Sequence, residues 1–246
     1  MSGKTHQSAR RVGIMFRRKK IWISELFSLF FVYAILILFF SLSVSILINH
    51  AVIERNSRKC ASLRAEKVEM IQLIEQLEAQ EKITVAMKSV VRNTLSDTVF
   101  YQLVDLVYRN SKTYGYDPLL VLAVIQVESF FEPNALGRYK NMRLSGALGL
   151  MQVKPETARE VAGNLGIPMP RDEDLFNPDI NIVVGIAYLT KCIGTFKSFK
   201  LGLLAYNQGP GVIKGCLQEN QPLSIAYYER VLKKYFTLKK AIEPLL

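Results

Sequence analysis

Apolar positions divide this chain into one long apolar stretch and a series of shorter, amphipathic segments. Residues 26–48 contain no charged side chain and are rich in Leu, Ile, Phe and Val. These 23 residues suffice, as a helix, to cross the hydrocarbon core of a bilayer. We therefore predict one transmembrane helix within residues 21–50. A cleaved signal peptide is the competing interpretation, but it needs a shorter apolar core and a small-x-small cleavage site, which residues 46–52 do not offer.

An amphipathic helical stalk is predicted over residues 51–96. Residues 52–95 contain neither Gly nor Pro, and apolar side chains recur there at three- and four-residue steps among Glu, Lys and Gln, at Leu63, Met70, Ile74 and Leu77. Three interpretations stay open: a coiled coil that forms a homodimer through residues 52–95, a spacer that holds the next domain away from the membrane, and a helix packed on its own domain.

The remaining residues, 97–246, contain several helix-sized segments with clear start and stop signals. Asp117-Pro118, Lys154-Pro155 and Asn177-Pro178 place a polar residue before a proline, which is typical of a helix start. Helices are predicted over residues 100–114, from 118 to a point before 133, and over 155–163, 178–196 and 224–240. Three glycines between residues 134 and 153 predict a loop or a short irregular strand. The fold class is therefore mainly α.

Charge is distributed unevenly, which argues against a nucleic-acid partner. The formal net charge is +11, but residues 1–20 carry seven Lys or Arg and no acid, whereas residues 97–246 carry 17 basic and 14 acidic residues. The basic arm before the apolar stretch indicates a cytoplasmic N-terminus by the positive-inside rule. Everything after His50 should then lie outside the cytoplasm.

The three cysteines and two histidines show no metal-ligand spacing, so we predict neither a metal site nor a cofactor. Cys192 and Cys216 form a disulfide in one interpretation and remain buried free thiols in the other.

Glu128 is the only ionisable residue in the apolar segment from residue 118 to 131. Desolvation and the negative pole of its predicted helix both disfavour the carboxylate, so its pKa should be raised. A carboxyl group that is protonated near neutral pH can serve as the general acid for a glycosidic bond. The alternative is a glutamate that points outward, or one that nearby basic residues satisfy.

A second carboxylate opposite Glu128 is not evident. Glu132 is the nearest, and it would share the face of Glu128 if the helix continued. Glu156, Glu160 and the acids at 172–174 lie in segments typical of solvated helix starts and loops. The pattern favours chemistry that uses one carboxyl group and a nucleophile supplied by the substrate.

Four ordered motifs carry a family resemblance. VIQVESFFEPNAL, GALGLMQVKPETA, NPDINIVVGIAYL and LLAYNQGPGVI together resemble the SLT-type lytic transglycosylases, the bacterial relatives of goose-type lysozyme, over roughly residues 97–246. The resemblance implies a lysozyme-like catalytic domain, α+β with minimal β. It also implies non-hydrolytic cleavage of the MurNAc-GlcNAc β-1,4 bond of peptidoglycan, with 1,6-anhydro-MurNAc ends as products.

The resemblance also assigns residues. Glu128 would be the single catalytic acid/base, and the substrate-binding set would be Ser129, Gly149, Leu150, Met151, Gln152, Tyr206, Asn207 and Tyr227. Gly149 would permit a tight turn that lets the Gln152 amide approach a sugar, and Met151 would be either floor packing or a sugar contact. Tyr206 and Asn207 would lie near the acetamido group, with Gly209 and Gly211 forming the turn after them.

Tyr227 matches the family's last motif by its distance from Val231-Leu232, and it would donate a hydrogen bond to Glu128. The adjacent Tyr228 leaves a one-residue alternative open. Asn181, Gly185 and Tyr188 should share one helix face and act mainly in packing. The basic stretch 137–144 departs from the family pattern, and its Arg138, Lys140 and Arg143 would either meet acidic peptide stems or remain solvated.

The leading hypothesis is a single-pass protein of the bacterial inner membrane whose catalytic domain lies in the periplasm and acts on peptidoglycan glycan strands. Two alternatives remain: a hydrolytic muramidase on the same fold, and a non-catalytic peptidoglycan-binding scaffold.

Overall fold

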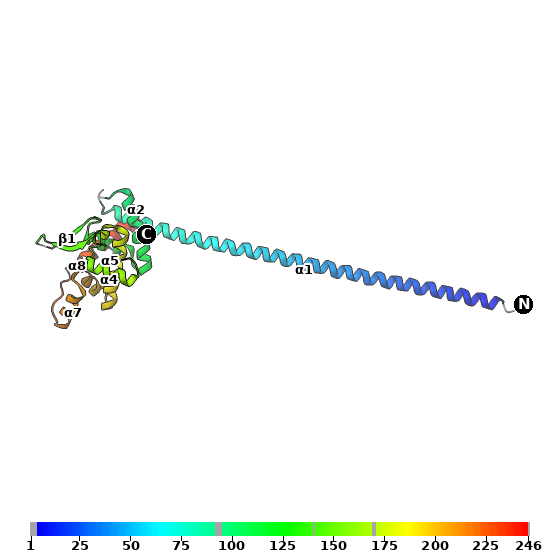
Figure 1. Cartoon of the computed structure of the whole chain (residues 1–246). Coiled ribbons are helices and arrows are strands. Elements are labelled where there is room, and N and C mark those ends of the chain that lie inside the picture. The colour runs from blue at the N-terminus through cyan, green and yellow to red at the C-terminus, as the bar shows by residue number, and fades with distance from the viewer. Residues whose placement is uncertain (1–3, 92–94, 140, 169–170, 246) are drawn as a thin grey trace. The chain divides into compact units, whose positions relative to one another are not determined.

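The structure is a computed structural model that describes residues 4–91, 95–139, 141–168 and 171–245 (Figure 1). The side chains of residues 4–24 are outside this description. The chain divides into two compact units, Met1–Gln72 and Leu73–Leu246. Each unit is described by itself.

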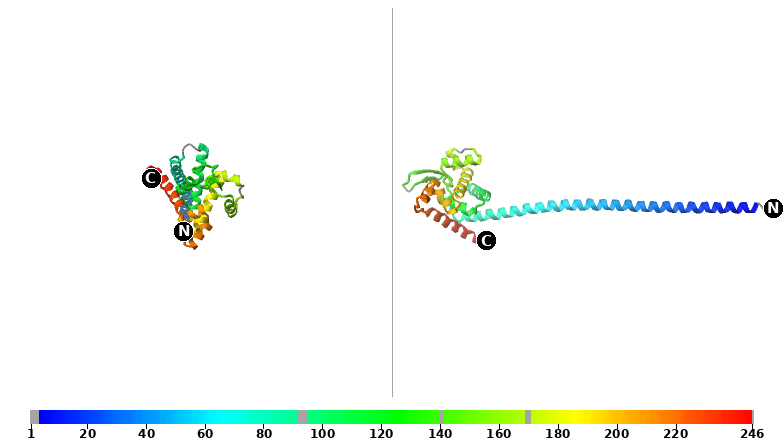
Figure 2. Two further views of the ribbon diagram at one scale, coloured as in Figure 1. Left: turned by 90° about the vertical axis from the view of Figure 1, so that its left-hand side faces the viewer. Right: turned by 90° about the horizontal axis from the view of Figure 1, so that it is seen from below.

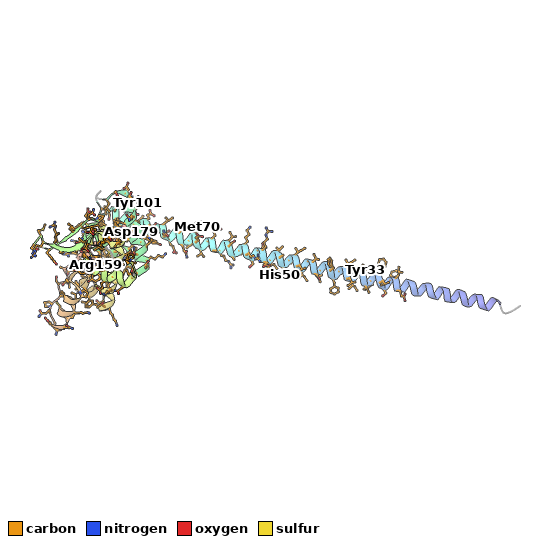
Figure 3. All side chains as sticks on the ribbon, in the orientation of Figure 1. Tyr33, His50, Met70, Tyr101, Arg159 and Asp179 are labelled. Carbon is orange, nitrogen blue, oxygen red and sulfur yellow. The ribbon has the colours of Figure 1, made fainter. Side chains whose placement is uncertain are left out.

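The described part of the first unit lies within one helix, α1 (Lys4–Lys88), which contains the predicted transmembrane segment. The apolar side chains of residues 26–48 are exposed, and Tyr33, His50 and Met70 project outward from the helix (Figure 3). Two helical segments of the described chain are long and apolar enough to cross a membrane: Glu25–Val90, with a mean hydropathy of 2.7, and Pro178–Phe196, with 1.3. Of the apolar window in the second segment 39% is buried, whereas none of the window in the first segment is buried.

The end of α1 belongs to the second unit and packs into its core. Ile83, Ala86 and Met87 are at most 1% exposed, and Gln80 Nε2 donates to Asp105 Oδ1 at 3.4 Å. Three interpretations were open for residues 52–95. The end of this segment is therefore a helix that packs on its own domain. The side chains of Leu63, Met70, Ile74 and Leu77 are exposed.

Helices α2 (Asp97–Tyr114) and α3 (Pro118–Glu128) begin and end at the signals in the sequence. The Asp117 carboxylate accepts from Leu119 N at 2.9 Å, and Gly115 ends α2 in the left-handed region, with φ 71°. Helix α3 ends at Glu128, well before Pro133, because the backbone turns left-handed at Phe130 (φ 53°) and Phe131 (φ 66°). Glu128 is consequently the last helical residue.

The glycine-rich segment forms an antiparallel hairpin of β1 (Leu136–Arg138) and β2 (Leu144–Leu148), which agrees with the expected short irregular strand. The hairpin extends from the helices of the second unit (Figures 1 and 2). An isolated bridge pairs Leu148 with Val153, just before α4 (Pro155–Leu165). A short 3₁₀ helix, η1 (Asp172–Phe176), follows.

The last helices are α5 (Pro178–Phe196), α6 (Phe199–Gln208), α7 (Pro210–Gln218) and α8 (Ala226–Ile242), followed by η2 (Glu243–Leu245). Helix α5 packs against α2 and α6, and α8 packs against α3. Figure 2 shows α8, in red, along the edge of this unit. Helices α6 and α7 were not predicted, because each is short and contains a glycine. The mainly α fold class is confirmed.

All three cysteines lie within the described residues and are free, with Cys192 buried. The structure therefore agrees with free thiols, and Cys192 and Cys216 do not form a disulfide.

Candidate active site

Glu128 lies at the wall of a cleft of about 1010 Å³ in the second unit. The cleft is bounded by the end of α3, the β1–β2 hairpin, the start of α4, the middle of α5, the turn between α6 and α7, and α8. Polar and charged side chains line much of it: Glu128, Ser129, Arg138, Ser145, Gln152, Lys154, Glu156, Thr157, Tyr188, Tyr206, Asn207, Gln208 and Arg230.

The carboxyl group of Glu128 has a strongly perturbed proton affinity. Burial at the end of the apolar helix α3 raises its pKa from 4.5 to about 7, while the hydrogen bond from Tyr227 and the charge of Arg230 oppose that increase. The sequence-based prediction of a raised pKa is confirmed in direction. A carboxyl group with this pKa is partly protonated at neutral pH.

Tyr227, on the first turn of α8, is the residue that contacts Glu128. Its Oη donates to Glu128 Oε1 at 2.6 Å, and its side chain is 3% exposed. The neighbouring Tyr228 instead lies over Phe199, with ring centroids 6.4 Å apart. The expected hydrogen bond is thus present and the one-residue alternative is excluded. Tyr227 stands behind Glu128 and is absent from the cleft wall.

Ser129 follows Glu128 and lines the cleft, but its hydroxyl is already engaged. Its Oγ donates to Ile125 O at 3.2 Å and its backbone N donates to the same carbonyl at 3.0 Å. Ser129 therefore closes the end of α3, which fixes the direction of the Glu128 side chain.

The predicted Gly-Leu-Met-Gln segment contributes only Gln152 to the cleft wall. Leu150 and Met151 are at most 1% exposed, so Met151 is packing beneath the cleft. Gly149 is also buried, with φ 75°, and a Cβ there would overlap the Asn181 amide and the Leu175 carbonyl. The expectation that Gly149 lets the chain approach a sugar is corrected: the close approach is to Asn181.

The Gln152 amide is held in place by the backbone around it. Its Nε2 donates to Gly149 O at 2.8 Å and to Ala135 O at 3.2 Å. Both bonds use the amino group, so the amide oxygen is left for another donor.

Asn181 organises the turn beneath the cleft. Its Nδ2 donates to Leu175 O at 2.7 Å and to Leu148 O at 2.9 Å, while its Oδ1 accepts from Met151 N at 2.7 Å. Gly185, one turn further along α5, allows Met151 to pack closely, since a Cβ there would come within 2.5 Å of Met151 Sδ. These two residues have the expected packing roles.

Tyr188, the third residue of this motif, additionally lines the cleft. Its ring lies 5.4 Å from that of Tyr206, centroid to centroid. The Tyr206 hydroxyl donates to Met151 O at 2.6 Å, so it is satisfied by the backbone, where a contact to an acetamido group was expected. Asn207 is exposed at the cleft wall.

The turn after Asn207 is made by one glycine, not two. Gly209 has φ 93°, whereas Gly211 lies inside α7 with helical geometry. The expected role of Gly211 in the turn is therefore wrong.

Several cleft residues escaped sequence reasoning. Lys154, Glu156 and Thr157 come from the start of α4, where the sequence predicts a solvated position for Glu156. Their only signal in the sequence is their position immediately after Gln152. Of the basic stretch, Arg138 lines the cleft and Lys140 lies outside the described residues.

Glu132 is absent from the cleft wall. It is exposed, and its carboxylate accepts from Asn134 N at 3.0 Å.

The second unit is thus a mainly helical domain with a partly protonated glutamate at the wall of a polar cleft. Its sequence matches a known family of enzyme domains. Residues 105–228, half of the chain, match the family described as "Transglycosylase SLT domain". The chain belongs to this family.

Similar curated proteins include the membrane-bound lytic murein transglycosylase C of Histophilus somni strain 2336, which is 36% identical over 137 residues, or 51% of this chain and 36% of that protein. The protein of the same name from Edwardsiella ictaluri is 37% identical over 123 residues, 46% of this chain and 33% of its own length. The chain thus matches about a third of the length of these relatives.

Similar solved structures include an inactive variant of the lytic transglycosylase Slt from Pseudomonas aeruginosa, with a TM-score of 0.41 and 27% identity. Another is the 70 kDa soluble lytic transglycosylase of Escherichia coli, with a TM-score of 0.42 and 25% identity. Each match covers 56% of this chain and 22% of the other.

Proposed function

We propose that this chain is a peptidoglycan lytic transglycosylase that uses Glu128 as its single catalytic acid/base. The observation that carries the proposal is the Glu128 carboxyl group, which lines the cleft of an SLT domain with a pKa of about 7 and a tyrosine donor at 2.6 Å. A pKa near the working pH lets one group give up a proton and then take one back.

The reaction proceeds in two proton transfers. Protonated Glu128 donates to the oxygen of the MurNAc-GlcNAc bond as the C1–O4 bond breaks. The carboxylate then takes the proton of the MurNAc 6-hydroxyl, whose oxygen bonds to C1 and closes the 1,6-anhydro ring. No water is consumed, and the N-acetyl oxygen of the substrate stabilises the positive charge at C1 between the two transfers.

Tyr227 controls the carboxylate stage of this cycle. Its hydroxyl donates to Oε1 and so stabilises the charged form, which has to persist until the 6-hydroxyl arrives. Because Ser129 closes α3 and Tyr227 comes from α8, the carboxyl group is fixed from two elements. Such positioning lowers the entropic cost of reaching the reactive geometry.

The substrate-binding roles fall to the polar groups that face the cleft. Gln152 and Asn207 offer amide groups to sugar hydroxyl and acetamido groups, and Ser129 and Tyr206 form the wall around Glu128. Gly149, Leu150 and Met151 act from beneath by holding this wall in place.

A hydrolytic muramidase on the same fold is the second candidate, because Glu156 also lines the cleft. A carboxylate there could serve as the base that activates water in an inverting hydrolysis. If so, Glu156→Gln would abolish cleavage as thoroughly as Glu128→Gln. We expect Glu156→Gln to retain cleavage, since transfer to the 6-hydroxyl needs no second carboxylate.

The apolar stretch of α1 is proposed to anchor the protein as a single span in the bacterial inner membrane. Seven Lys or Arg in residues 1–20 favour a cytoplasmic N-terminus, which places the catalytic domain, residues 97–246, in the periplasm beside its substrate. A cysteine-accessibility experiment in spheroplasts would show labelling of Cys60 by an impermeant reagent. Labelling only after lysis would reverse the orientation.

The exposed apolar positions of α1 that precede Ile83 are proposed to form a homodimeric coiled coil within residues 52–95. Leu63, Met70 and Leu77 are 54–55% exposed and recur at seven-residue intervals. Mass measurement of the full chain in detergent should give a dimer that Met70→Asp dissociates, whereas a monomeric wild type would contradict it.

The test of catalysis uses the full chain in detergent and purified peptidoglycan. Release of soluble fragments should fall at least about a thousandfold in Glu128→Gln, which cannot transfer the proton. Glu132→Gln is the matched control, because Glu132 is four residues away, exposed and outside the cleft wall. Undiminished release by Glu128→Gln would refute the assignment. Binding of glycan without release by the wild type would favour the scaffold.

A further inference from the structure

Phe130, two residues after Glu128, combines two unfavourable features. Its backbone is left-handed, with φ 53°, and its side chain is 69% exposed. A bulky residue with positive φ is strained, and an exposed benzyl group gains little from burial. The next residue, Phe131, is also left-handed (φ 66°), but it is 1% exposed and so is compensated by packing. Burial gives Phe130 no such compensation.

Phe130 nevertheless occupies a definite place, because it lines the same cleft as Glu128. A strained residue that persists without benefit to folding suggests a role in function. A ligand that occupies the cleft next to the carboxyl group therefore meets this residue.

Lys234 fixes the ring from the opposite element. Its Nζ lies 5.6 Å from the centroid of the Phe130 ring, within range of a cation–π contact. Lys234 is seven residues after Tyr227 on α8, so both lie on one face of that helix. The same helix face therefore holds the carboxyl group of Glu128 and the ring of Phe130.

We propose that Phe130 is a stacking platform for a pyranose ring of the glycan strand in the subsite beside Glu128, with Lys234 as a positioning residue that orients the platform. The proposal rests on the proposed function, whose cleft accepts a sugar polymer. The C–H face of a pyranose is apolar, and a flat aromatic ring offers it apolar contact area that the amides of Gln152 and Asn207 lack.

Binding is measured separately from catalysis, with the full chain in detergent, the Glu128→Gln substitution as background, and a chitin oligosaccharide as the probe in calorimetry. Adding Phe130→Leu should weaken binding about tenfold, since the flat contact is lost while an apolar side chain remains. Phe130→Trp should retain it. Lys234→Met should weaken binding about threefold and Lys234→Arg should restore it.

Two control variants separate this role from general effects. Phe236→Leu removes an exposed aromatic ring on α8 that is absent from the cleft wall, and it should leave binding unchanged. Phe130→Gly and Lys197→Gly both relieve a left-handed residue and should raise the melting temperature, but only Phe130→Gly should weaken binding.

Peptidoglycan cleavage is then measured with Glu128 intact. Phe130→Leu should raise KM with little change in kcat, because the contact stabilises the ground state and the transition state equally. Unchanged oligosaccharide affinity in Phe130→Leu, or no measurable binding before it is introduced, would overturn the platform. If the wild type fails to cleave peptidoglycan while binding still depends on Phe130, the proposed function fails and the platform stands.

Discussion

Tyr227 Oη donates to Glu128 Oε1 at 2.6 Å, although 99 residues separate the two in the chain. The contact exists because α8 packs against α3 and places Tyr227 behind the last residue of that helix. Burial alone would raise the pKa of Glu128 further, and the tyrosine hydrogen bond limits that increase. This pair therefore sets the pH range in which the carboxyl group can both give and accept a proton.

The pH dependence of cleavage should follow this pair. The first proton transfer needs protonated Glu128, so activity should decline as the pH rises through a pKa of about 7. Tyr227→Phe removes a bond that favours the carboxylate, so the pKa should rise and the alkaline limb should move to higher pH. We expect kcat to fall about tenfold to a hundredfold at neutral pH, measured as fragment release across a pH series.

Tyr228→Phe is the matched control, because Tyr228 follows Tyr227 in α8 but packs edge-on against Phe199. Its profile should coincide with the wild type. If the alkaline limb of Tyr227→Phe lies at the same pH as that of the wild type, the hydrogen bond has no part in setting the pKa of Glu128.

The pKa of Glu128 also has a consequence for stability. Between its ordinary pKa of 4.5 and about 7 the folded state binds a proton that the unfolded state does not, so the free energy of unfolding should fall as the pH rises. Glu128→Gln removes this dependence. At pH 5 the two proteins should be similar, whereas at pH 8 the variant should be more stable by at most about 3 kcal/mol, because part of the carboxylate faces the cleft.

Urea unfolding of both proteins in detergent at the two pH values provides this measurement. A wild type that gains stability relative to Glu128→Gln as the pH rises would contradict a raised pKa.

Asn181 should be important for folding. Its amide makes three hydrogen bonds, to Leu148, Leu175 and Met151, and the last two are buried. Asn181→Ala leaves all three backbone groups without that partner. We expect a loss of about 3 kcal/mol in the free energy of unfolding. Asn164→Ala, at an exposed position of α4, should change it by less than about 0.5 kcal/mol. A similar small change in Asn181→Ala would mean that the turn beneath the cleft does not depend on this amide.

Gly149 and Gly163 should respond oppositely to alanine. At Gly149 the left-handed backbone and the overlap with Leu175 and Asn181 predict a destabilisation of at least about 2 kcal/mol. At Gly163 a Cβ meets nothing within 4 Å inside helix α4, so Gly163→Ala should stabilise by about 0.5 kcal/mol. Thermal unfolding of both variants gives the comparison. Equal changes in stability would show that the space around each glycine does not decide the effect of the alanine.

Much of the fold was predictable because start and stop signals are local. Asp117-Pro118 and Asn177-Pro178 fix the first turns of α3 and α5, and Gly115 fixes the end of α2. The end of α3 was not predictable, because two left-handed phenylalanines end it before any proline or glycine does. Helices α6 and α7 were missed because their stability comes from packing, which the local sequence does not record.

The candidate site was predictable only in part, for a similar reason. The position of Glu128 in an apolar segment indicates burial, and burial explains its pKa. Which groups face the cleft depends on how α4, α5 and α8 are packed. Arg230 therefore carried no local signal, and the positions of Tyr188 and Glu156 in or beside a motif did not show that they face the cleft. Conversely, Leu150 and Met151 belong to a recognisable motif yet lie beneath the cleft.

The central claim is that a group of the substrate, and not water, completes the reaction that Glu128 begins. Mass analysis of the muropeptides released from purified peptidoglycan by the full chain in detergent tests it most directly. The account predicts products with 1,6-anhydro-MurNAc ends, each one water lighter than its hydrolysed counterpart, and their loss in Glu128→Gln. Products that end in reducing sugars, and that disappear in Glu156→Gln, would contradict it and identify a hydrolase.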